Sequence, residues 1–400
     1  MKVLVLNCGS SSVKFKLLEM ADETELAGGI VEEIGHASQL FFKTGDNKEL
    51  TQSLDISSYE HAIQLVLDTL LDKRYGVIGK KTEISAIGHR VVHGGPEFDQ
   101  STLITEQVIK AINAVISLSP LHNPPNLEGI SACQKLFPDT PQVAVFDTAY
   151  GARLPQAAYD YAIPEPWKTK HHIRRYGFHG TSHSYVSSRA AEIVQQPLEA
   201  LRIISCHLGS GASVCATQNG RCVETSMGFT PLEGLVMSTR SGDIDPAIIP
   251  FIAKHEGLSV EEIDTVLNRE SGLKALCGTT DFRVAEENAK NGDSAADCAL
   301  RLYAHRVKKY IGAYMCLMGG LDVLIFTAGV GEHSAYIRGK IVFNLNAFGL
   351  LLDHQRNERN DLDIGKGRVK VLVIPTNEEL AIARDTRAIL DQSERGEKLF

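Results

Sequence analysis

The sequence predicts an α/β protein with two domains of duplicated topology. Its 400 residues exceed what one hydrophobic core usually serves, so two domains are expected. Residues 3–16 (VLVLNCGSSSVKFK) have the pattern of an apolar strand, a polar turn and a second, alternating strand. Residues 201–213 (LRIISCHLGSGAS) repeat this pattern near the start of the second half. The repeat indicates an ancient duplication in which both turns face one cleft.

Both turns have the composition of phosphate-binding loops. In the first turn, Gly9 lets the backbone approach a ligand closely, and Lys14 follows a run of serine hydroxyls. Ordinary hairpins also use glycine and serine, so the first turn alone leaves both interpretations open. The Gly-Ser-Gly turn at residues 209–211 favours phosphate binding, because the pattern then occurs once in each half.

The composition is that of an ordinary globular protein, with 43% hydrophobic and 22% charged residues. The formal net charge of −8 argues against a nucleic-acid partner, so phosphate groups must meet locally placed Arg and Lys. The eight cysteines show no C-x-x-C pair and no metal-ligand spacing, which indicates reduced, mostly buried thiols. Since no long apolar segment occurs, neither a signal peptide nor a membrane span is expected, and the predicted location is cytoplasmic.

Helical and strand patterns alternate along the chain, as an α/β fold requires. A capping box, Ser57-x-x-Glu60, marks the start of the first helix. Apolar spacing predicts helices at residues 58–73, 105–117 and 294–318. Short apolar runs predict strands at residues 84–87, 142–146, 322–327 and 371–374. The prolines of SPLHNPPN interrupt regular structure and predict a loop at residues 119–126.

Arg90 follows the strand predicted at residues 84–87. A guanidinium beside glycines, with no acid next to it in the sequence, needs an anionic partner from elsewhere, either a structural carboxylate or a ligand. The neighbouring His89 and His93 are expected to be packed, hydrogen-bonded core residues. His122, in the proline-rich segment, is a candidate ligand contact. Asp147 follows a buried strand, where open α/β sheets place functional groups, although a cap or turn role is the alternative.

The second half contains a further set of anion-binding candidates. His179 precedes a helix that Thr181 or Ser182 would cap, and anions collect at helix N-termini. Arg240 lies in a Thr-Arg-Ser-Gly turn, where its guanidinium suits a carboxylate or phosphoryl oxygen; Asp243 is the alternative, structural partner.

A nucleotide seat is predicted where the strand at residues 322–327 ends. The small-residue loop AGVGEHS (residues 328–334) follows that strand and leads into a helix, and backbone amides at such a junction bind phosphate. Near the C-terminus, Thr376-x-x-Glu379 is expected to cap the last helix. Glu379 then has a structural role, whereas Glu378 is free to point into the cleft.

Several longer motifs are spread from the first strand to the last helix. They read NCGSSSVKF, GHRVVHGG, LHNPPN, FDTAY, YGFHGTSH, HLGSGAS, SMGFTPLEGLVMSTRSGDIDP, FTAGVGEHS and PTNEELAIARDT. Their order and spacing resemble the acetokinase family, which belongs to the acetate and sugar kinase, Hsp70 and actin superfamily. The resemblance implies that the chain folds into two RNase H-like (actin/Hsp70-type) domains with an interdomain cleft. It also implies that two chains form a homodimer. These domains would be residues 1–150, joined by a C-terminal helix at 384–400, and residues 151–383. The sequence departs from the family's usual residues at Ser210, His333, Ser238 and Gly151.

The resemblance also implies roles for individual residues. Arg90 and Arg240 would flank the acyl phosphate, and His179 would contact the transferring phosphoryl group. His122 would contact the substrate, and Asp147 would be the family's catalytic acid. The alkyl group of the acid would lie in a small pocket of Val92, Leu121, Phe178 and Pro231. Mg²⁺, or Mn²⁺, would be served by Asn7 and Glu378. ATP or ADP would contact Ser10, Ser12, Lys14, His207, Leu208, Gly209, Ser210, Gly211, Asp281, Phe282, Arg283, Gly329, Val330, Gly331, Glu332 and His333.

The implied reaction is ATP + acetate ⇌ ADP + acetyl phosphate, by direct in-line transfer. A carboxylic acid of pKa about 4 to 5 is already ionised at neutral pH, so no general base is required. Asp147 is therefore expected to orient an arginine or a Mg²⁺-bound water rather than to remove a proton from acetate.

Alternative functions differ in what they require of these residues. A propionate or butyrate kinase would share every charged residue and differ only in pocket volume. An Hsp70-like or actin-like ATPase would use the two turns but would not need Arg90, Arg240 or His179. A Walker-type kinase and a serine hydrolase are disfavoured, because G-x-x-x-x-G-K-[ST] and G-x-S-x-G do not occur.

Overall fold

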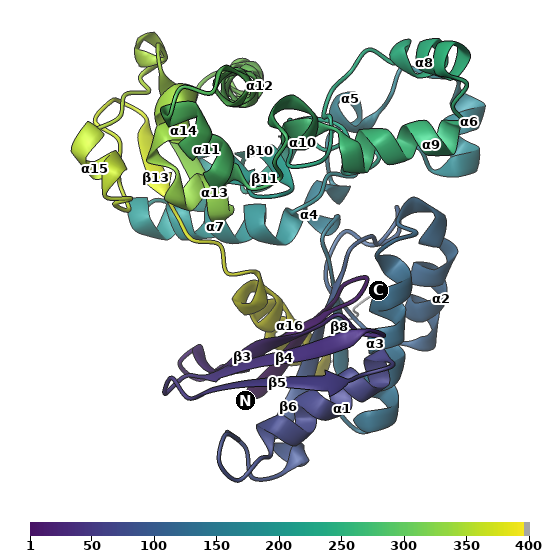
Figure 1. Ribbon diagram of the computed structural model, residues 1–400. Coiled ribbons are helices and arrows are strands. Elements are labelled where there is room, and N and C mark those ends of the chain that lie inside the picture. The colour runs from purple at the N-terminus through teal and green to yellow at the C-terminus, as the bar shows by residue number, and fades with distance from the viewer. Residues whose placement is uncertain (396–400) are drawn as a thin grey trace. The chain divides into compact units, whose positions relative to one another are not determined.

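The computed structural model describes residues 1–395, and the chain divides into two compact units (Figure 1). Unit 1 comprises Met1–Ala152 and the segment that begins at Asn377, and unit 2 comprises Arg153–Thr376. The chain returns to unit 1 before the expected boundary at residue 383, because the whole of α16 (Glu378–Glu394) is one helix that packs on the unit 1 sheet. Residues 396–400 of the helix predicted at 384–400 lie outside the described residues.

Unit 1 is built on a mixed sheet. Over the described part of the chain its eight strands run in the order β5-β4-β3-β2-β1-β6-β8-β7. Their bounds are β1 (Lys2–Cys8), β2 (Val13–Glu19), β3 (Thr24–Glu32), β4 (Ala37–Thr44), β5 (Glu49–Asp55), β6 (Ile84–Val91), β7 (Thr102–Leu103) and β8 (Gln142–Phe146). β1 pairs antiparallel with β2 and parallel with β6, and β6 pairs parallel with β8. The predicted turn after β1 is closed by the Gly9 amide, which donates to the Ser12 carbonyl oxygen at 2.8 Å.

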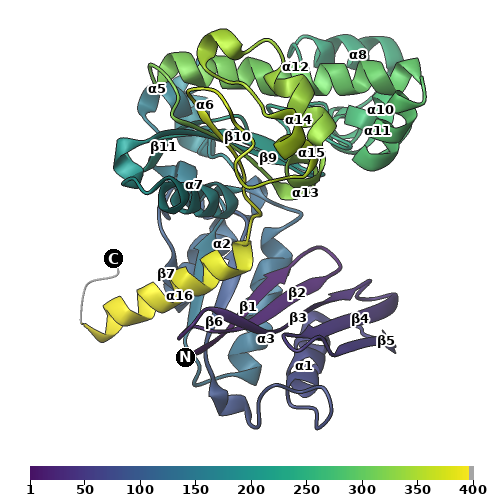
Figure 2. The ribbon, with the colours of Figure 1, turned by 90° about the vertical axis from the view of Figure 1, so that its left-hand side faces the viewer.

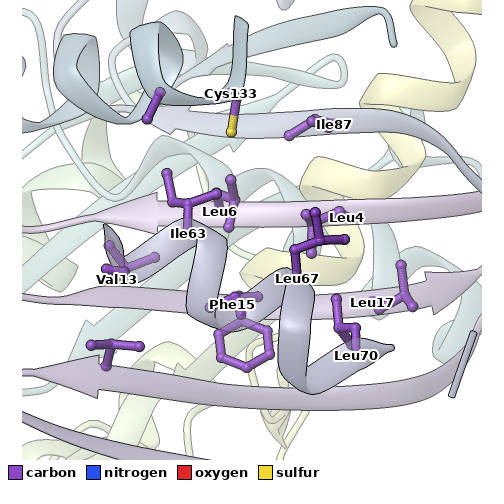
Figure 3. Close-up of a cluster of buried hydrophobic side chains, with 14 of the residues drawn as sticks. Leu4, Leu6, Val13, Phe15, Leu17, Ile63, Leu67, Leu70, Ile87 and Cys133 are labelled. Carbon is purple, nitrogen blue, oxygen red and sulfur yellow. The ribbon is translucent and has the colours of Figure 1, made fainter. Parts of the chain in front are cut away.

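One face of the unit 1 sheet forms a core with α1 (Tyr59–Leu70) and α3 (Asn123–Leu136) (Figure 3). Because side chains alternate along a strand, Leu4 and Leu6 of β1 and Phe15 of β2 all point to this face. Ile63 and Leu67 of α1 pack on them. Unit 1 also contains α2 (Glu106–Ala114) and α4 (Ala149–Ala152).

The opposite face of this sheet is covered by α16 (Figure 2). Gly88 in β6 permits the close approach, since a Cβ there would lie 2.5 Å from Thr386 Oγ1 and 2.7 Å from Ile382 Cγ2. α16 is therefore a structural layer of unit 1, and its first residue, Glu378, is held near the edge where β6 and β8 end.

Unit 2 repeats the strand arrangement of unit 1. Within residues 153–376 its five-stranded sheet has the order β11-β10-β9-β12-β13. The strands are β9 (Arg202–Leu208), β10 (Ala212–Gln218), β11 (Arg221–Thr225), β12 (Val323–Thr327) and β13 (Lys370–Val373). In both units an antiparallel meander, β1 to β3 or β9 to β11, continues beyond its first strand into two parallel strands. This shared order confirms the predicted duplication.

Helices cover both faces of the unit 2 sheet. On one face, Val186 and Ala190 of α7 (Gly180–Val194) pack against Ile203 and Ile325. On the other face, α12 (Ser294–Leu317) contacts β9 and β10 (Figure 2) and matches the helix predicted at residues 294–318. The remaining helices are α5 (Gln156–Tyr159), α6 (Glu165–His171), α8 (Ile248–Glu256), α9 (Val260–Thr265), α10 (Gly272–Cys277), α11 (Phe282–Lys290), α13 (Ala328–His333), α14 (Ala335–Val342) and α15 (His354–Glu358).

Two segments predicted as loops are helical. The expected loop at residues 119–126 contains the start of α3, with Pro124 and Pro125 in its first turn. Proline suits that position, because its fixed φ is helical and the first-turn N–H groups have no intrahelical partner. Residues 328–333, predicted as part of a small-residue loop, form the short helix α13.

Two predicted helix caps are also wrong by one residue. Ser58, not Ser57, caps α1, and its hydroxyl accepts from the His61 amide. Asn377 caps α16 through the Leu380 amide, which displaces the predicted box at Thr376. Side chains of serine and asparagine compete for such positions, and only the entry direction of the chain decides between them.

The cysteines are all free, as predicted, and Cys8, Cys133, Cys206, Cys215 and Cys222 are buried. Helices in the described part of the chain are either too short or too polar to cross a membrane.

His89 and His93 are buried core residues, as predicted. His89 Nε2 lies 2.8 Å from Gln142 Oε1, and His93 Nδ1 accepts from the Gly95 amide. Burial lowers the pKa of each imidazole to about 4. Both rings are therefore neutral in the folded protein at neutral pH.

This burial predicts that unfolding becomes easier in acid. Below pH about 6.5 the imidazoles of the unfolded chain become protonated, whereas the folded rings stay neutral down to pH about 4. Each ring therefore lowers the free energy of unfolding by about 1.4 kcal/mol per pH unit between these values. His89→Gln should make the free energy of unfolding less dependent on pH, because one fewer proton is taken up on unfolding. Urea denaturation between pH 7 and 4.5 would measure this slope. An unchanged slope would contradict the neutral state of His89.

Candidate functional site

Arg90 and Asp147 form an ion pair at one edge of the unit 1 sheet. Arg90 stands opposite Val145 in the parallel ladder of β6 and β8, so Asp147 follows at the same edge. Arg90 Nη2 donates to Asp147 Oδ2 at 2.8 Å, and Asp147 is only 1% exposed. Burial disfavours the charged form of Arg90, but the negative charges of Asp147 and then Glu378 outweigh this effect and raise the pKa of Arg90. The pair fits the expected orienting role of Asp147.

Glu378 lies beside this pair. Its Oε2 is 3.9 Å from Arg90 Nε, and that nitrogen is buried without a hydrogen-bond partner among the described residues. Burial raises the pKa of Glu378 to about 7, and Arg90 only partly opposes this. The Arg90 Nε–H group and the Glu378 carboxylate thus leave a donor and an acceptor for a ligand.

Two asparagines of α3 hold the strand ends around Arg90. Asn126 Oδ1 accepts from the Val92 amide at 3.0 Å, and its Nδ2 donates to the Cys8 carbonyl oxygen at 2.8 Å. Asn123 bonds both the amide and the carbonyl of His93, at 3.1 Å and 2.9 Å. Sequence reasoning missed both residues. Their spacing within HNPPN, which puts them on one helix face, was the available signal.

The other predicted unit 1 residues lie around these strand ends. Val92 is buried, whereas Leu121 is 57% exposed. His122 directly precedes α3 as its N-cap residue. Asn7 is half-buried near the end of β1. The predicted phosphate ligand Lys14 pairs with Glu379, which is free of the capping role that the sequence suggested.

The remaining turn residues are accessible. Ser10 is exposed and Ser12 is half-buried.

Phe178, from the predicted alkyl pocket, belongs to unit 2, where it is buried just ahead of α7. Pro231 is also in unit 2, and its carbonyl oxygen is 3.5 Å from Arg240 Nη1.

In unit 2, His179 and Arg240 converge on the Gly-Ser-Gly turn. A Cβ on Gly211 would lie 3.3 Å from His179 Nε2 and 3.7 Å from Arg240 Nη1. His179 itself, rather than Thr181 or Ser182, is the N-cap residue of α7, in a left-handed conformation (φ 57°) that is costly for a side chain of this size. The absence of a side chain at Gly211 therefore lets both an imidazole and a guanidinium lie close to the backbone of the turn.

Within residues 1–395 Arg240 makes no ion pair; its Nη1 contacts the Pro231 carbonyl oxygen at 3.5 Å and Met237 Sδ at 3.8 Å. The alternative partner, Asp243, instead accepts from the Gly234 amide and the Tyr310 hydroxyl. Burial lowers the pKa of Arg240. A half-buried guanidinium without a carboxylate is a place for an anion.

A buried chain of hydroxyls and imidazoles orients His179. His179 Nδ1 lies 2.8 Å from Ser213 Oγ, which is also 2.8 Å from His183 Nε2, and His183 Nδ1 lies 2.7 Å from Ser205 Oγ. Burial, and then His207, lowers the pKa of His183 well below its ordinary value, so this ring is neutral. The chain directs His179 Nε2 toward Gly211. Sequence reasoning missed His183, although it stands four residues after His179 on one helix face.

His207 supports the same ring from below. The His179 and His207 rings stack with centroids 4.1 Å apart, and His207 Nδ1 lies 2.8 Å from Ser182 Oγ. His207 is buried, so its stacking holds the His179 ring in place.

A cavity of about 620 Å³ in unit 2 unites three segments that were predicted separately to hold nucleotide. Its size lies within the usual range for small-molecule sites. The predicted residues that line it are Gly209, Ser210, Phe282, Arg283, Gly329, Val330 and His333. Ser334, the last residue of the predicted AGVGEHS segment, also lines it. Glu286, Glu287 and Lys290 line it too and were not predicted, because the helical turns beyond Arg283 carry no motif.

The other predicted nucleotide residues hold this lining in place. Leu208 is fully buried in the sheet core. Asp281 caps α11 and pairs with Arg283 at 2.6 Å. Glu332 Oε1 accepts from the Thr376 amide at 3.2 Å. Gly331 offers its carbonyl oxygen to Arg338 at 2.9 Å.

Arg338 ties α13 to the rest of unit 2, and no sequence motif predicted this role. This guanidinium is 0% exposed and donates to the carbonyl oxygens of Gly331, Glu332 and Asn357 at 2.9, 3.0 and 2.7 Å. Burial lowers its pKa to about 10.

Arg338→Met is expected to lower the free energy of unfolding by about 3 kcal/mol, because three buried carbonyl oxygens lose their donors. Chemical denaturation would measure the loss. Arg356→Met, at an exposed site on α15, is the control and should change stability little. Equal stabilities for the two variants would contradict the role of Arg338.

Asn7 and Glu378 carry the kind of oxygen ligand that Mg²⁺ prefers. No cluster of three or more His, Cys, Asp or Glu side chains able to hold a metal occurs in residues 1–395. Mg²⁺ does not need one, since one or two carboxylates with substrate phosphates usually hold it. The half-buried Glu378, whose pKa burial raises to about 7, is a carboxylate that a dication would stabilise.

The duplicated sheets and the nucleotide-sized cavity define a two-domain protein of the acetate and sugar kinase fold class. The model of the Acetokinase family matches residues 2–384. The chain belongs to the acetokinase family.

Relatives and solved structures cover nearly the whole chain. The acetate kinase of Halothermothrix orenii is 53% identical over 98% of this chain and 100% of its own length. The acetate kinase of Thermotoga maritima is 52% identical over 98% and 99%. The crystal structure of Porphyromonas gingivalis acetate kinase has a TM-score of 0.94 at 45% identity, covering 97% of this chain and 99% of that one. A propionate kinase from Francisella tularensis has a TM-score of 0.92 at 44% identity, with the same coverage.

Proposed function

We propose that this protein catalyses ATP + acetate ⇌ ADP + acetyl phosphate. The observation that carries the proposal is the guanidinium of Arg240, which pairs with no carboxylate among residues 1–395 and lies with His179 Nε2 around the Gly-Ser-Gly turn. The family relationship over residues 2–384 supports the same reaction.

The chemistry asks for charge stabilisation rather than proton transfer. An acetate oxygen forms a bond to the γ-phosphorus while the bond from that phosphorus to the ADP oxygen breaks. Acetate is already ionised at neutral pH, so no base takes part. Arg240 and His179 would stabilise the negative charge that spreads over the phosphoryl oxygens, and Arg90, oriented by Asp147, would bind acetate or the acyl phosphate.

Mg²⁺ is part of this proposal, with Asn7 and Glu378 as the residues that would serve it. When bound with the nucleotide it neutralises phosphate charge. The hydroxyls of Ser10 and Ser12, and Lys14, would contact phosphate oxygens. Lys14 would then exchange its Glu379 partner for phosphate.

Formation of acyl phosphate, trapped with hydroxylamine, tests the reaction. ATP consumption should depend strictly on an added carboxylate and should yield acetyl hydroxamate in proportion to ADP. ATP turnover that proceeds equally without a carboxylate would support an ATPase of the Hsp70 or actin type and would overturn the proposal.

Propionate is the second candidate acceptor, because a propionate kinase has nearly the same fold as this chain. One methylene changes binding by only about 1 to 3 kcal/mol, so the preference among acids should be graded. Comparing kcat/KM for acetate, propionate and butyrate would rank them. Propionate as the preferred acid would shift the assignment within the family without changing the roles of the charged residues.

We also propose a cytoplasmic homodimer. The apolar helix α8 supports an interface, since none of its residues is buried and Phe251 is 59% exposed. Light scattering should give twice the chain mass, and Phe251→Asp should weaken the dimer. A monomer at micromolar concentration would contradict this part of the proposal.

A further inference from the structure

Unit 2 contains a second cavity, of about 590 Å³, that the proposed reaction does not use. It lies among α12, α14 and α15, and its size again suits a small molecule. Five basic side chains line it: Arg301, His305 and Lys308 from α12, Lys340 from α14, and His354 from α15. The spacing of Arg301, His305 and Lys308 places these three residues on one face of α12.

The charges around this cavity are not balanced. Lys308 has no carboxylate partner within residues 1–395, and its ammonium donates only to the Phe343 carbonyl oxygen, at 2.7 Å. Burial lowers the pKa of Lys308. Asp297 is shared by two of the cations, at 3.2 Å from Arg301 Nε and 3.3 Å from Lys340 Nζ. An acidic residue, Glu358, also lines the cavity, and its Oε1 is 3.8 Å from His354 Nδ1. An anion bound near Lys308 and Arg301 would therefore meet cations that protein carboxylates only partly compensate.

Aromatic rings supply the apolar part of the lining. Tyr336 and Phe343 face the cavity, with Lys340 Nζ 4.6 Å from the Tyr336 ring centroid and Lys308 Nζ 5.9 Å from that of Phe343. A ligand that combines an aromatic group with an anionic group would match both the rings and the cations.

This cavity is separate from the nucleotide cavity but close to it. Ser334 lines the nucleotide cavity, whereas the next two residues, Ala335 and Tyr336, line the second one. Lys290, from the nucleotide cavity, lies 5.3 Å from the centroid of the same Tyr336 ring. Any binding experiment must therefore distinguish the two cavities.

We propose that the cavity among α12, α14 and α15 is a second ligand site, for a small aromatic monophosphate of about the size of a nucleoside monophosphate. Its phosphate would lie between Lys308 and Arg301, and its ring would pack on Tyr336 or Phe343. This site goes beyond the proposed reaction and needs no turnover.

Calorimetric titration with 1-naphthyl phosphate tests the site on the full-length protein saturated with Mg²⁺ and ADP. One equivalent should bind with the nucleotide in place, and inorganic phosphate should bind at least about tenfold more weakly, because it lacks the ring. Absence of binding, or one-for-one competition with ADP, would overturn the second site. Equal affinity for inorganic phosphate would overturn the aromatic part. Failure of ADP itself to bind would instead count against the proposed function.

Matched variants locate the probe. Lys308→Gln should weaken binding about tenfold or more, since it removes a hydrogen bond to a charged group. Lys309→Gln, on the exposed side of the same helix, is the control and should leave the affinity unchanged. Arg301→Gln gives a second, exposed substitution that does not disturb the core. If neither Lys308→Gln nor Arg301→Gln differs from Lys309→Gln, the phosphate does not bind in this cavity and the proposal fails.

Discussion

Arg240→Ala is expected to lower kcat/KM for acetate by about 10³-fold, the scale of losing an arginine that stabilises a phosphoryl transition state. The structure supplies the reason. In the described part of the chain this guanidinium has no carboxylate to neutralise, and its Nη1 lies with His179 Nε2 around Gly211. Its charge is therefore available to the phosphoryl oxygens. Steady-state kinetics of hydroxamate formation would measure the loss.

The controls for Arg240 separate chemistry from folding. Arg240→Lys keeps the charge but loses the planar fork, so it should recover only part of the activity. Guanidinium ion added to Arg240→Ala should recover some rate, whereas added ammonium should do less. Arg189→Ala removes an exposed arginine of α7 that pairs with Glu192 on the same helix, and it should behave as wild type. A loss below tenfold in Arg240→Ala would refute the assigned role.

Asp147→Asn is expected to lower kcat/KM by about 10²-fold, because a misplaced binding group costs on that scale. The carboxylate holds Arg90 Nη2 at 2.8 Å, and acetate needs no base, so the loss should come from a mispositioned arginine. Arg90→Ala should cost about 10³-fold. The double variant should lose little more than Arg90→Ala alone, since residues that act as a unit are not additive.

Two outcomes would contradict this reading of Asp147. If its loss and that of Arg90 multiplied in the double variant, the carboxylate would have an independent role. If Asp147→Asn matched wild type in both rate and Mg²⁺ dependence, it would have no positioning role at all. In Asp147→Asn, kcat should show no new dependence on pH on the alkaline side, since no proton is removed from acetate in the reaction.

The sequence by itself determined those features that depend on neighbours in the chain. The apolar runs became β1, β9 and β12, and the two glycine-serine turns follow the first two of these strands. The repeated strand pattern indicated the duplication that the two sheets display. The residue types of the nucleotide segments were sufficient to choose seven residues that line one cavity. Local errors arose at helix starts, where prolines are tolerated and adjacent polar residues compete to cap.

Only the tertiary structure decided which side chains act together. Arg90 meets Asp147 because β6 and β8 share a register, and His179 is held by Ser213 and His183 because β10 lies against α7. Arg338 and the second cavity gave no sequence signal. The physical reason is range: periodicity and turn chemistry act over a few residues, whereas these contacts form only when sheet pairing and helix packing bring distant segments within hydrogen-bonding distance.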